Sequence, residues 1–121
     1  MVSVTISIGS NCGDRKALVK EAMEWLKTIL IQVKCSDIYE TPCVLKTGKP
    51  YMNGVVSGFY QGIGYDLEDS LKTKEKEMGR SAECRERGDV PIDLDLVICD
   101  GDIVRPRDYK QKFFQIGFSQ L

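Results

Sequence analysis

The sequence contains no histidine, and none of its five cysteines is paired with another at C-x-x-C spacing. Protein zinc sites are usually built from closely spaced Cys and His ligands, so the composition argues against a zinc-dependent function. Widely spaced cysteines in odd number are typical of free thiols in a reducing compartment. We therefore expect unpaired and mostly buried thiols.

Long apolar segments are also absent. No apolar run approaches the ~20 residues that span a bilayer, and the first residues lack the basic-then-apolar order of a signal peptide. These absences predict a cytoplasmic protein without a membrane partner. The formal net charge is −1, which gives no basic excess of the kind that indicates nucleic-acid binding. The length of 121 residues and the 42% hydrophobic content predict one globular domain over residues 1–121.

Apolar periodicity predicts four strands and two helices. Residues that alternate between apolar and polar predict strands at 2–8, 31–39, 51–61 and 91–98. Apolar residues three or four apart predict helices at 15–30 and 66–79. The resulting order, βαββαβ, is typical of the ferredoxin-like α+β fold, in which both helices pack on one face of an antiparallel sheet.

Smaller signals mark the ends of these elements. Asp14 and Asp66 are candidate helix caps, Asp100-Gly101 is typical of a hairpin turn, and the charged stretch 80–89 has no period and is expected to be a loop. The apolar residues in the tail 109–121 favour a further helix.

The fourth strand carries the most informative pattern. Ile92, Leu94, Leu96 and Ile98 alternate with polar residues and predict a buried face. Asp93 and Asp95 then share the other face, with their Cα atoms about 6.6 Å apart. Two carboxylates this close repel each other, and magnesium, which accepts oxygen ligands and substrate phosphates, is a suitable compensating cation. Two such ions could be shared between the pair and an ATP triphosphate. A solvent-exposed pair, or a pair neutralised by Arg80, Arg85 or Arg87, is the alternative.

Five segments, in order, resemble the 6-hydroxymethyl-dihydropterin pyrophosphokinase family. These are Ile8-Gly9-Ser10-Asn11, Tyr39-x-Thr41-Pro42, Tyr51-Met52-Asn53, Met78-Gly79-Arg80 and Ile92-Asp93-Leu94-Asp95. Each is weak alone, but chance does not readily produce five in order. The resemblance implies an ATP-dependent enzyme of folate biosynthesis, which transfers pyrophosphate from ATP to the pterin hydroxymethyl group and releases AMP.

The resemblance also implies roles for individual residues. The matched Asp93 and Asp95 bind two magnesium ions that bridge the ATP phosphates, and the matched Arg80 stabilises the transferring group. The pterin pocket is implied to contain six residues: Thr41, Pro42, Val44, Tyr51, Asn53 and Phe114. Among them, Asn53 binds the pterin edge, and Tyr51 and Phe114 enclose its ring.

The sequence departs from the family pattern at three places. Ala82 and Val90 stand where the family has arginines, and the histidine of its P-H segment has no counterpart. Arg85, Arg87, Arg105, Arg107 and Lys112 are candidate replacement cations. The departures keep open a second hypothesis, a pterin- or nucleotide-binding relative with weak or no catalysis. A third, less favoured hypothesis is an unrelated interaction domain with the same fold.

Overall fold

The computed structural model describes residues 1–44 and 48–121, and it confirms an α+β chain with an antiparallel sheet. The sheet order is β2-β4-β1-β5-β6, and β3 pairs with β4 outside this path. The strands are β1 (Val2–Ser10), β2 (Leu30–Cys35), β3 (Tyr39–Thr41), β4 (Tyr51–Tyr60), β5 (Asp93–Cys99) and β6 (Asp102–Ile103). The helices are α1 (Arg15–Ile29), α2 (Gly64–Glu77), α3 (Ala82–Glu86), α4 (Pro106–Tyr109) and α5 (Lys112–Phe118).

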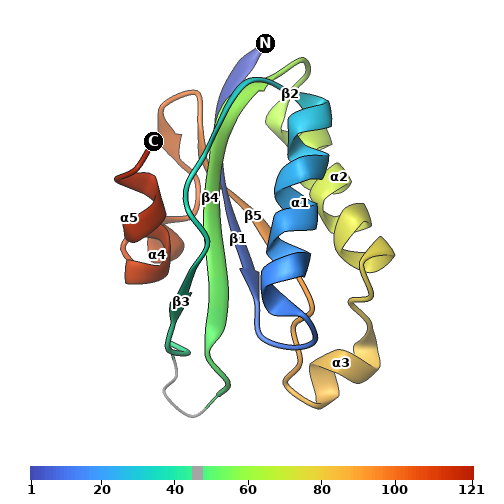
Figure 1. Ribbon diagram of the computed structural model, residues 1–121. Helices are drawn as coiled ribbons and strands as arrows, with labels where there is room; N and C mark the ends of the chain where they lie inside the picture. Colours follow the sequence, from blue (N-terminus) through green and yellow to red (C-terminus); the bar gives the residue numbers. More distant parts are fainter. Residues whose placement is uncertain (45–47) are drawn as a thin grey trace.

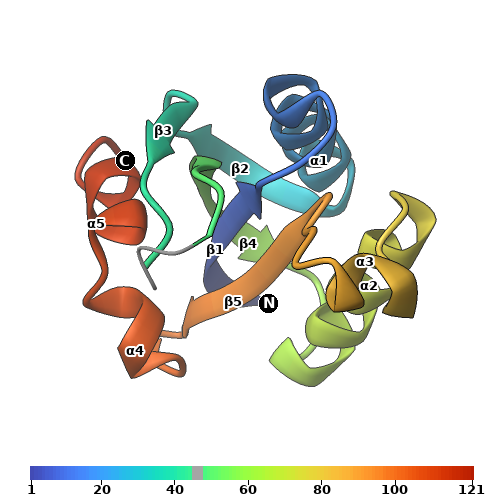
Figure 2. The same ribbon diagram turned by 90° about the horizontal axis from the view of Figure 1, so that it is seen from below.

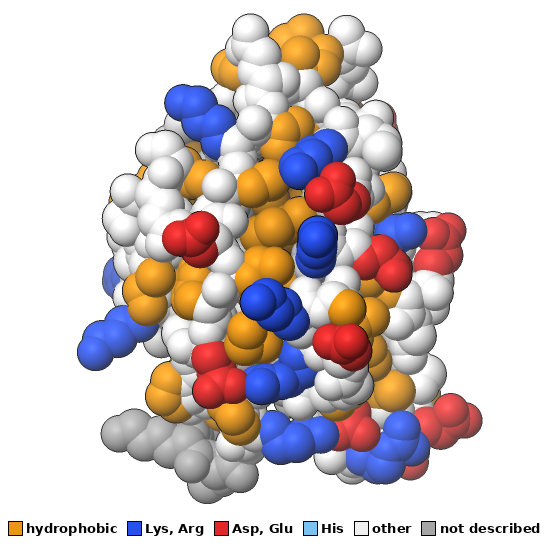
Figure 3. All heavy atoms as spheres, viewed as in Figure 1, with side chains coloured by type: hydrophobic (Ala, Val, Ile, Leu, Met, Phe, Trp, Pro, Cys, Tyr) orange, Lys and Arg blue, Asp and Glu red, His pale blue; other side chains and the backbone are white. Residues whose placement is uncertain are grey.

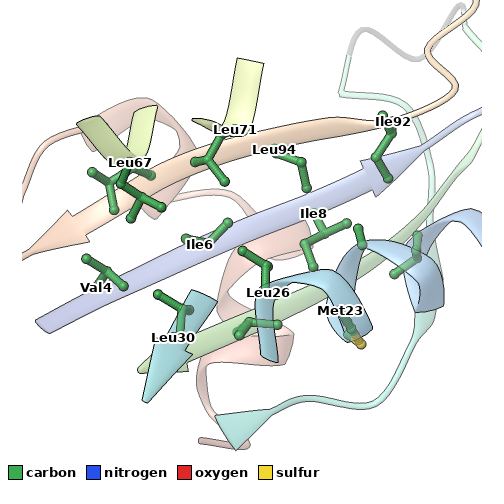
Figure 4. Close-up of a cluster of buried hydrophobic side chains, with 14 residues drawn as sticks. Val4, Ile6, Ile8, Met23, Leu26, Leu30, Leu67, Leu71, Ile92 and Leu94 are labelled. Atoms are coloured by element: carbon green, nitrogen blue, oxygen red, sulfur yellow. The ribbon is translucent and has the colours of Figure 1, made fainter. Parts of the chain in front are cut away.

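The two long helices, α1 and α2, cover one face of the sheet, whereas α4 and α5 lie on the other face (Figures 1 and 2). The main core lies under α1 and α2 (Figure 4). It contains Val4, Ile6 and Ile8 of β1, which are 0–2% exposed, together with Leu26 of α1 and Leu71 of α2. The alternation in 2–8 therefore did predict the buried face of the central strand.

A second, smaller core lies on the opposite face of the sheet. Val55 of β4, Val97 of β5 and Phe114 of α5 are fully buried there. Ile98 packs against this second core, not against the main one, so its predicted orientation is wrong. The cause is a register shift in the β1–β5 pairing between Thr5 and Ile6, which adds one residue and changes the face on which the following side chain lies.

Several element boundaries differ from the sequence prediction. The predicted strand 31–39 is divided into β2 and β3. At the division, the Ser36 N–H donates to the Val55 carbonyl oxygen at 2.9 Å, and the Ser36 hydroxyl accepts the Val55 N–H at 2.8 Å. Asp14 caps α1 through the Ala17 N–H, but Asp66 lies inside the first turn of α2 and does not cap it. Gly79 follows α2 with a φ of +104°, a conformation that glycine adopts without strain.

The segment predicted as a loop at 80–89 contains the five-residue helix α3, capped by the Ser81 side chain. The tail does form a helix, α5. Asp100 and Gly101 both have positive φ, 51° and 83°, as the hairpin turn before β6 requires.

The cysteines are unpaired in the described residues, but they are partly or fully exposed, so the expectation of mostly buried thiols is wrong. On the face seen in Figure 3, acidic and basic side chains lie intermixed. Across residues 1–44 and 48–121, no helix is both long enough and apolar enough to span a bilayer.

Candidate active site

Three neighbouring strands bring the candidate residues together at one end of the sheet. Gly9 of β1 is paired with Asn53 of β4 on one side and with Asp93 of β5 on the other. A Cβ atom added at Gly9 would lie 3.3 Å from the Tyr51 ring and 3.6 Å from Asn53 Oδ1. Glycine therefore leaves room above the strand for these two side chains.

A pocket of about 230 Å³ opens beside Gly9 on the face opposite α1 and α2. Five of the six predicted pterin-binding residues line it: Thr41, Pro42, Val44, Tyr51 and Asn53. Asp93 also lines the pocket, so a ligand there would lie next to a carboxylate.

The sixth predicted residue, Phe114, does not reach the pocket. It is fully buried and stacks on Phe118 at 5.2 Å between ring centroids, so a stacking role for Phe114 disagrees with this structure. Its neighbour Phe113 lines the pocket instead. The sequence contains two adjacent phenylalanines, and consecutive helical residues lie on different faces, so the motif alone did not decide between them.

Phe113 is fixed through its backbone. The Tyr39 hydroxyl donates to the Phe113 carbonyl and accepts from the Gly117 N–H at 3.0 Å. Burial raises the pKa of Tyr39 above its usual value, so this hydroxyl keeps its proton at neutral pH. Strand β3 and helix α5 are thereby joined on one side of the pocket.

Asn53 is held in one orientation by its amide nitrogen. Nδ2 donates to Thr41 Oγ1 at 2.7 Å and lies 3.3 Å and 3.2 Å from the carbonyl oxygens of Tyr39 and Tyr51. Asn53 as a residue is 2% exposed. Because the nitrogen faces protein acceptors, the carbonyl oxygen Oδ1 is the group that a ligand can reach.

The two aspartates lie on the predicted face of β5 but differ in exposure. The Asp93 side chain is 37% exposed, and that of Asp95 is 11% exposed. Burial, together with the charge of Asp93 and a hydrogen bond to it, raises the pKa of Asp95 to about 6, although Lys72 and Arg105 act in the other direction. The two carboxyl groups are thus crowded, as their spacing predicted, and the crowding favours the protonated form of Asp95.

Basic side chains surround this pair. Arg80 contacts Asp93 at 2.9 Å and Glu75 at 3.2 Å, so the position predicted from the family motif does lie beside the aspartates. Lys72 contacts Asp95 Oδ1 at 3.2 Å, and Arg105 approaches the same oxygen at 3.6 Å. Arg105 was one of the candidate replacement cations.

Lys72 and Glu75 were not predicted from the sequence as members of this cluster. Glu75 is only 4% exposed, and its Oε2 accepts the Leu94 N–H at 2.7 Å. A signal was present, because Glu75 interrupts the apolar stripe of Leu67, Leu71 and Met78 on α2. A carboxylate at such a position is buried only when it is paired, and here its partners are Lys72, Arg80 and β5.

The donor set fits magnesium only with help from a substrate. Among the described residues, no three or more His, Cys, Asp or Glu side chains are grouped for metal binding. Magnesium in nucleotide enzymes needs just one or two carboxylates, because phosphates and water complete its octahedron. The oxygen-only pair of Asp93 and Asp95 meets that requirement.

Comparison with known proteins gives the family. The model for 7,8-dihydro-6-hydroxymethylpterin-pyrophosphokinase (HPPK) matches residues 5–121. This chain belongs to that family. The pyrophosphokinase resemblance stated from the sequence motifs is therefore confirmed.

Relatives of this pyrophosphokinase-family protein occur in plants and bacteria. A folate synthesis bifunctional protein of Arabidopsis thaliana is 38% identical over 96 residues, which cover 78% of this chain and 20% of that protein. A 2-amino-4-hydroxy-6-hydroxymethyldihydropteridine pyrophosphokinase of Porphyromonas gingivalis is 32% identical over 102 residues, 81% of this chain and 69% of that protein. A protein with the same name from Aquifex aeolicus is 29% identical over 108 residues, 88% of this chain and 67% of that protein. The chain thus spans about a fifth of the plant protein and about two thirds of the bacterial ones.

Proposed function

We propose that the protein transfers pyrophosphate from ATP to the hydroxymethyl group of 6-hydroxymethyl-7,8-dihydropterin, in folate biosynthesis, and releases AMP. The observation that carries the proposal is the adjacency of two features. Asp93 lines a small pocket with aromatic and amide walls, and it also belongs to the carboxylate pair suited to magnesium. An acceptor for a flat heterocycle therefore lies next to a site for a metal–nucleotide complex.

The pocket supports a pterin as the acceptor. Tyr51 and Phe113 provide aromatic surfaces for a ring, and Asn53 Oδ1 provides an acceptor for an N–H group on its edge. Such pockets bind mainly by apolar contact and gain specificity from a few placed polar groups. Phe113 takes the place that the family resemblance gave to Phe114, and Thr41, Pro42 and Val44 form the remaining wall.

Magnesium, when bound by Asp93 and Asp95 together with the triphosphate of ATP, would neutralise phosphate charge and orient the phosphate chain for in-line attack. Two ions are proposed, since two carboxylates and three phosphates can be shared between them. Arg80, beside Asp93, is proposed to stabilise charge on the transferring group.

The chemical step forms one bond and breaks one. The hydroxymethyl oxygen attacks the β-phosphorus and releases its proton to water. The bond from the β-phosphorus to the oxygen that it shares with the α-phosphorus breaks, so that AMP leaves with that oxygen. The residues around the site contribute positioning and charge, which are the main sources of catalysis in phosphoryl transfer.

The fold supports the same proposal. The order β2-β4-β1-β5, with α1 and α2 on one face, is consistent with the ferredoxin-like arrangement expected from the sequence, within one domain. We also propose a cytoplasmic location for the protein. In contrast, the name of one relative, from Pisum sativum, includes the word mitochondrial.

The test is AMP release from ATP and magnesium with and without the pterin. We expect AMP that depends on the pterin, together with a pterin product heavier by one pyrophosphate unit. Binding of both ligands without AMP would support the binding-only relative instead. Binding of neither would contradict the proposed function and the binding alternative together.

Replacing Asp93 with alanine tests the metal site directly. Asp93→Ala should weaken magnesium-dependent binding of a non-hydrolysable ATP analogue by roughly 100-fold, because a metal ligand is lost. Fluorescence titration with and without EDTA gives the metal-dependent part. Asp102→Ala, an exposed aspartate on β6, is the matched control. Equal affinities for the two variants would remove Asp93 from the site.

A further inference from the structure

Lys72 reaches the aspartates from the other side of the sheet. Helix α2 packs on the main-core face, but β5 has an open edge at Leu94, because β6 pairs only with Ile98 and Cys99. The Lys72 ammonium lies at this edge, 3.1 Å from the Leu94 carbonyl oxygen, 3.1 Å from Glu75 Oε2 and 3.2 Å from Asp95 Oδ1. One lysine thus contacts the backbone and two carboxylates at once.

A basic groove of about 680 Å³ begins at this lysine. Its lining is Lys72, Glu75, Lys76, Arg80, Ser81, Ala82 and Arg85. Four of these side chains are cations, and one of them, Arg80, also contacts Asp93. The aspartates therefore separate two hollows of different character, the aromatic pocket and a groove suited to an anion.

The contacts of Lys72 allow its ammonium to exchange one hydrogen-bond acceptor for another. An ammonium has three N–H donors, and here all three have acceptors. Glu75 is nearly buried and also holds Arg80 and the Leu94 N–H, so it and the Leu94 carbonyl fix the position of the ammonium. Asp95 is the one acceptor of the three that a bound magnesium would take. The third donor would then face the groove, and half of the Lys72 side chain is exposed there.

We propose that Lys72 binds the phosphate chain of the nucleotide, with one N–H moving from Asp95 to a phosphate oxygen when the metal–nucleotide complex binds. This inference rests on the proposed function and adds a phosphate-binding residue to it. The cation at Asp95 comes from helix α2, in a sequence without histidine.

The competing role for Lys72 is to neutralise Asp95 in the metal-free protein and nothing more. The two roles predict opposite results for Lys72→Gln. A phosphate contact present before and during transfer contributes to binding in both states, so its loss should raise the ATP KM about 10-fold with a smaller change in kcat. A purely neutralising lysine would compete with magnesium, and its removal would leave ATP affinity unchanged and lower the magnesium concentration needed for half-maximal binding.

The experiment measures binding of α,β-methylene-ATP with magnesium, and steady-state AMP release, in the same variants. Lys74→Gln removes a charge from the same helix at a site facing Trp25 and is the matched control. Lys72→Arg keeps the charge and should recover part of the affinity lost in Lys72→Gln. Thermal unfolding of each variant verifies that it is folded, and Lys72→Arg provides the comparison if Lys72→Gln is not.

Each outcome bears on a separate claim. Weaker analogue binding in Lys72→Gln than in Lys74→Gln supports the phosphate contact, even if the wild-type protein releases no AMP and the proposed function fails. Equal analogue binding in the two variants, in a wild-type protein that does release AMP, overturns the role of Lys72 and leaves the proposed function intact. No analogue binding by the wild-type protein overturns both.

Discussion

At the scale of single residues, Asp95 combines low exposure with a raised pKa. Its carboxyl is crowded by Asp93, and its surroundings favour the protonated form, although Lys72 and Arg105 lie close. When the pKa of an acid is higher in the folded state than in the unfolded state, its protonated form favours folding and its ionised form opposes folding. Folding stability is therefore lost as the pH rises from about 4 through about 6, and the loss is complete above that range.

Asp95→Asn should remove this cost in metal-free protein. We expect the variant to be more stable than the wild type by about 1–3 kcal/mol at pH 7.5, and equally stable near pH 4, since about two pKa units separate the folded and ordinary values. Urea unfolding in EDTA at a series of pH values measures the difference. A variant less stable than the wild type at pH 7.5 would contradict the assigned pKa.

The residue scale is also where the sequence was least informative. The motifs predicted a site with Asp93, Asp95, Arg80 and Asn53, because their spacing along the chain is itself the signal, and the structure brings these residues to one end of the sheet. Lys72 and Glu75 lie about 20 residues before the aspartates and meet them only through the packing of α2 on β5. No local pattern encodes that contact, apart from the charged residue within an apolar stripe.

At the scale of elements, α2 and β5 are joined by polar contacts at the strand edge. Leu94 uses both of its backbone groups, the N–H toward Glu75 and the carbonyl toward Lys72. An unpaired strand edge exposes backbone groups that can bind other chains. The helix side chains satisfy these groups, and they also fix β5, and hence Asp93, in position.

Glu75→Ala should separate these elements energetically. The change leaves Lys72, Arg80 and the Leu94 N–H without their shared acceptor, and we expect a loss of about 3 kcal/mol in the free energy of unfolding. Glu77→Ala, on the same helix with a side chain 62% exposed, should change it by less than about 0.5 kcal/mol. Similar losses in chemical denaturation of the two variants would show that Glu75 does not join the elements.

Periodicity predicted the two long helices and the central strands, but it did not predict the irregular points. The alternation in 2–8 and at Ile92, Leu94 and Leu96 predicted the correct buried face, because every second side chain of a strand points toward the same side of the sheet. The bulge near Val97 and the division between β2 and β3 depend on pairing with neighbouring strands. Helix α3 is too short and too polar to produce an apolar period.

At the scale of the whole molecule, the sheet separates two layers of unequal strength. The α1–α2 layer lies on the large core, whereas the α4–α5 layer is attached by the small cluster around Phe114 and by the Tyr39 hydroxyl. Regions with fewer buried contacts open more readily than the rest of a protein. The layer that supplies Phe113 to the pocket is thus the one expected to open first.

Tyr39→Phe should loosen that layer selectively. Loss of the two hydroxyl contacts, worth about 1–2 kcal/mol together, should speed amide exchange in α5 roughly 10-fold and leave exchange in β1 little changed. Hydrogen exchange followed by mass spectrometry measures both regions. Tyr60→Phe, in the partly buried surroundings of the main core, is the control, and uniform acceleration across the chain would contradict a separately opening layer.

The fixed orientation of Asn53 has a consequence for inhibitor chemistry. Because its amide nitrogen is engaged by Thr41 and by backbone carbonyls, the side chain cannot flip to donate to a ligand without losing those contacts. We therefore expect the pocket to select among tautomers of a bound heterocycle. In the proposed pterin site, heterocycles with an N–H on the edge that meets Asn53 should bind, and isosteres with a bare ring nitrogen there should lose about 1–3 kcal/mol of binding free energy, because that nitrogen meets oxygen lone pairs. A fragment library for this protein is best sorted by protonation pattern first and by shape second.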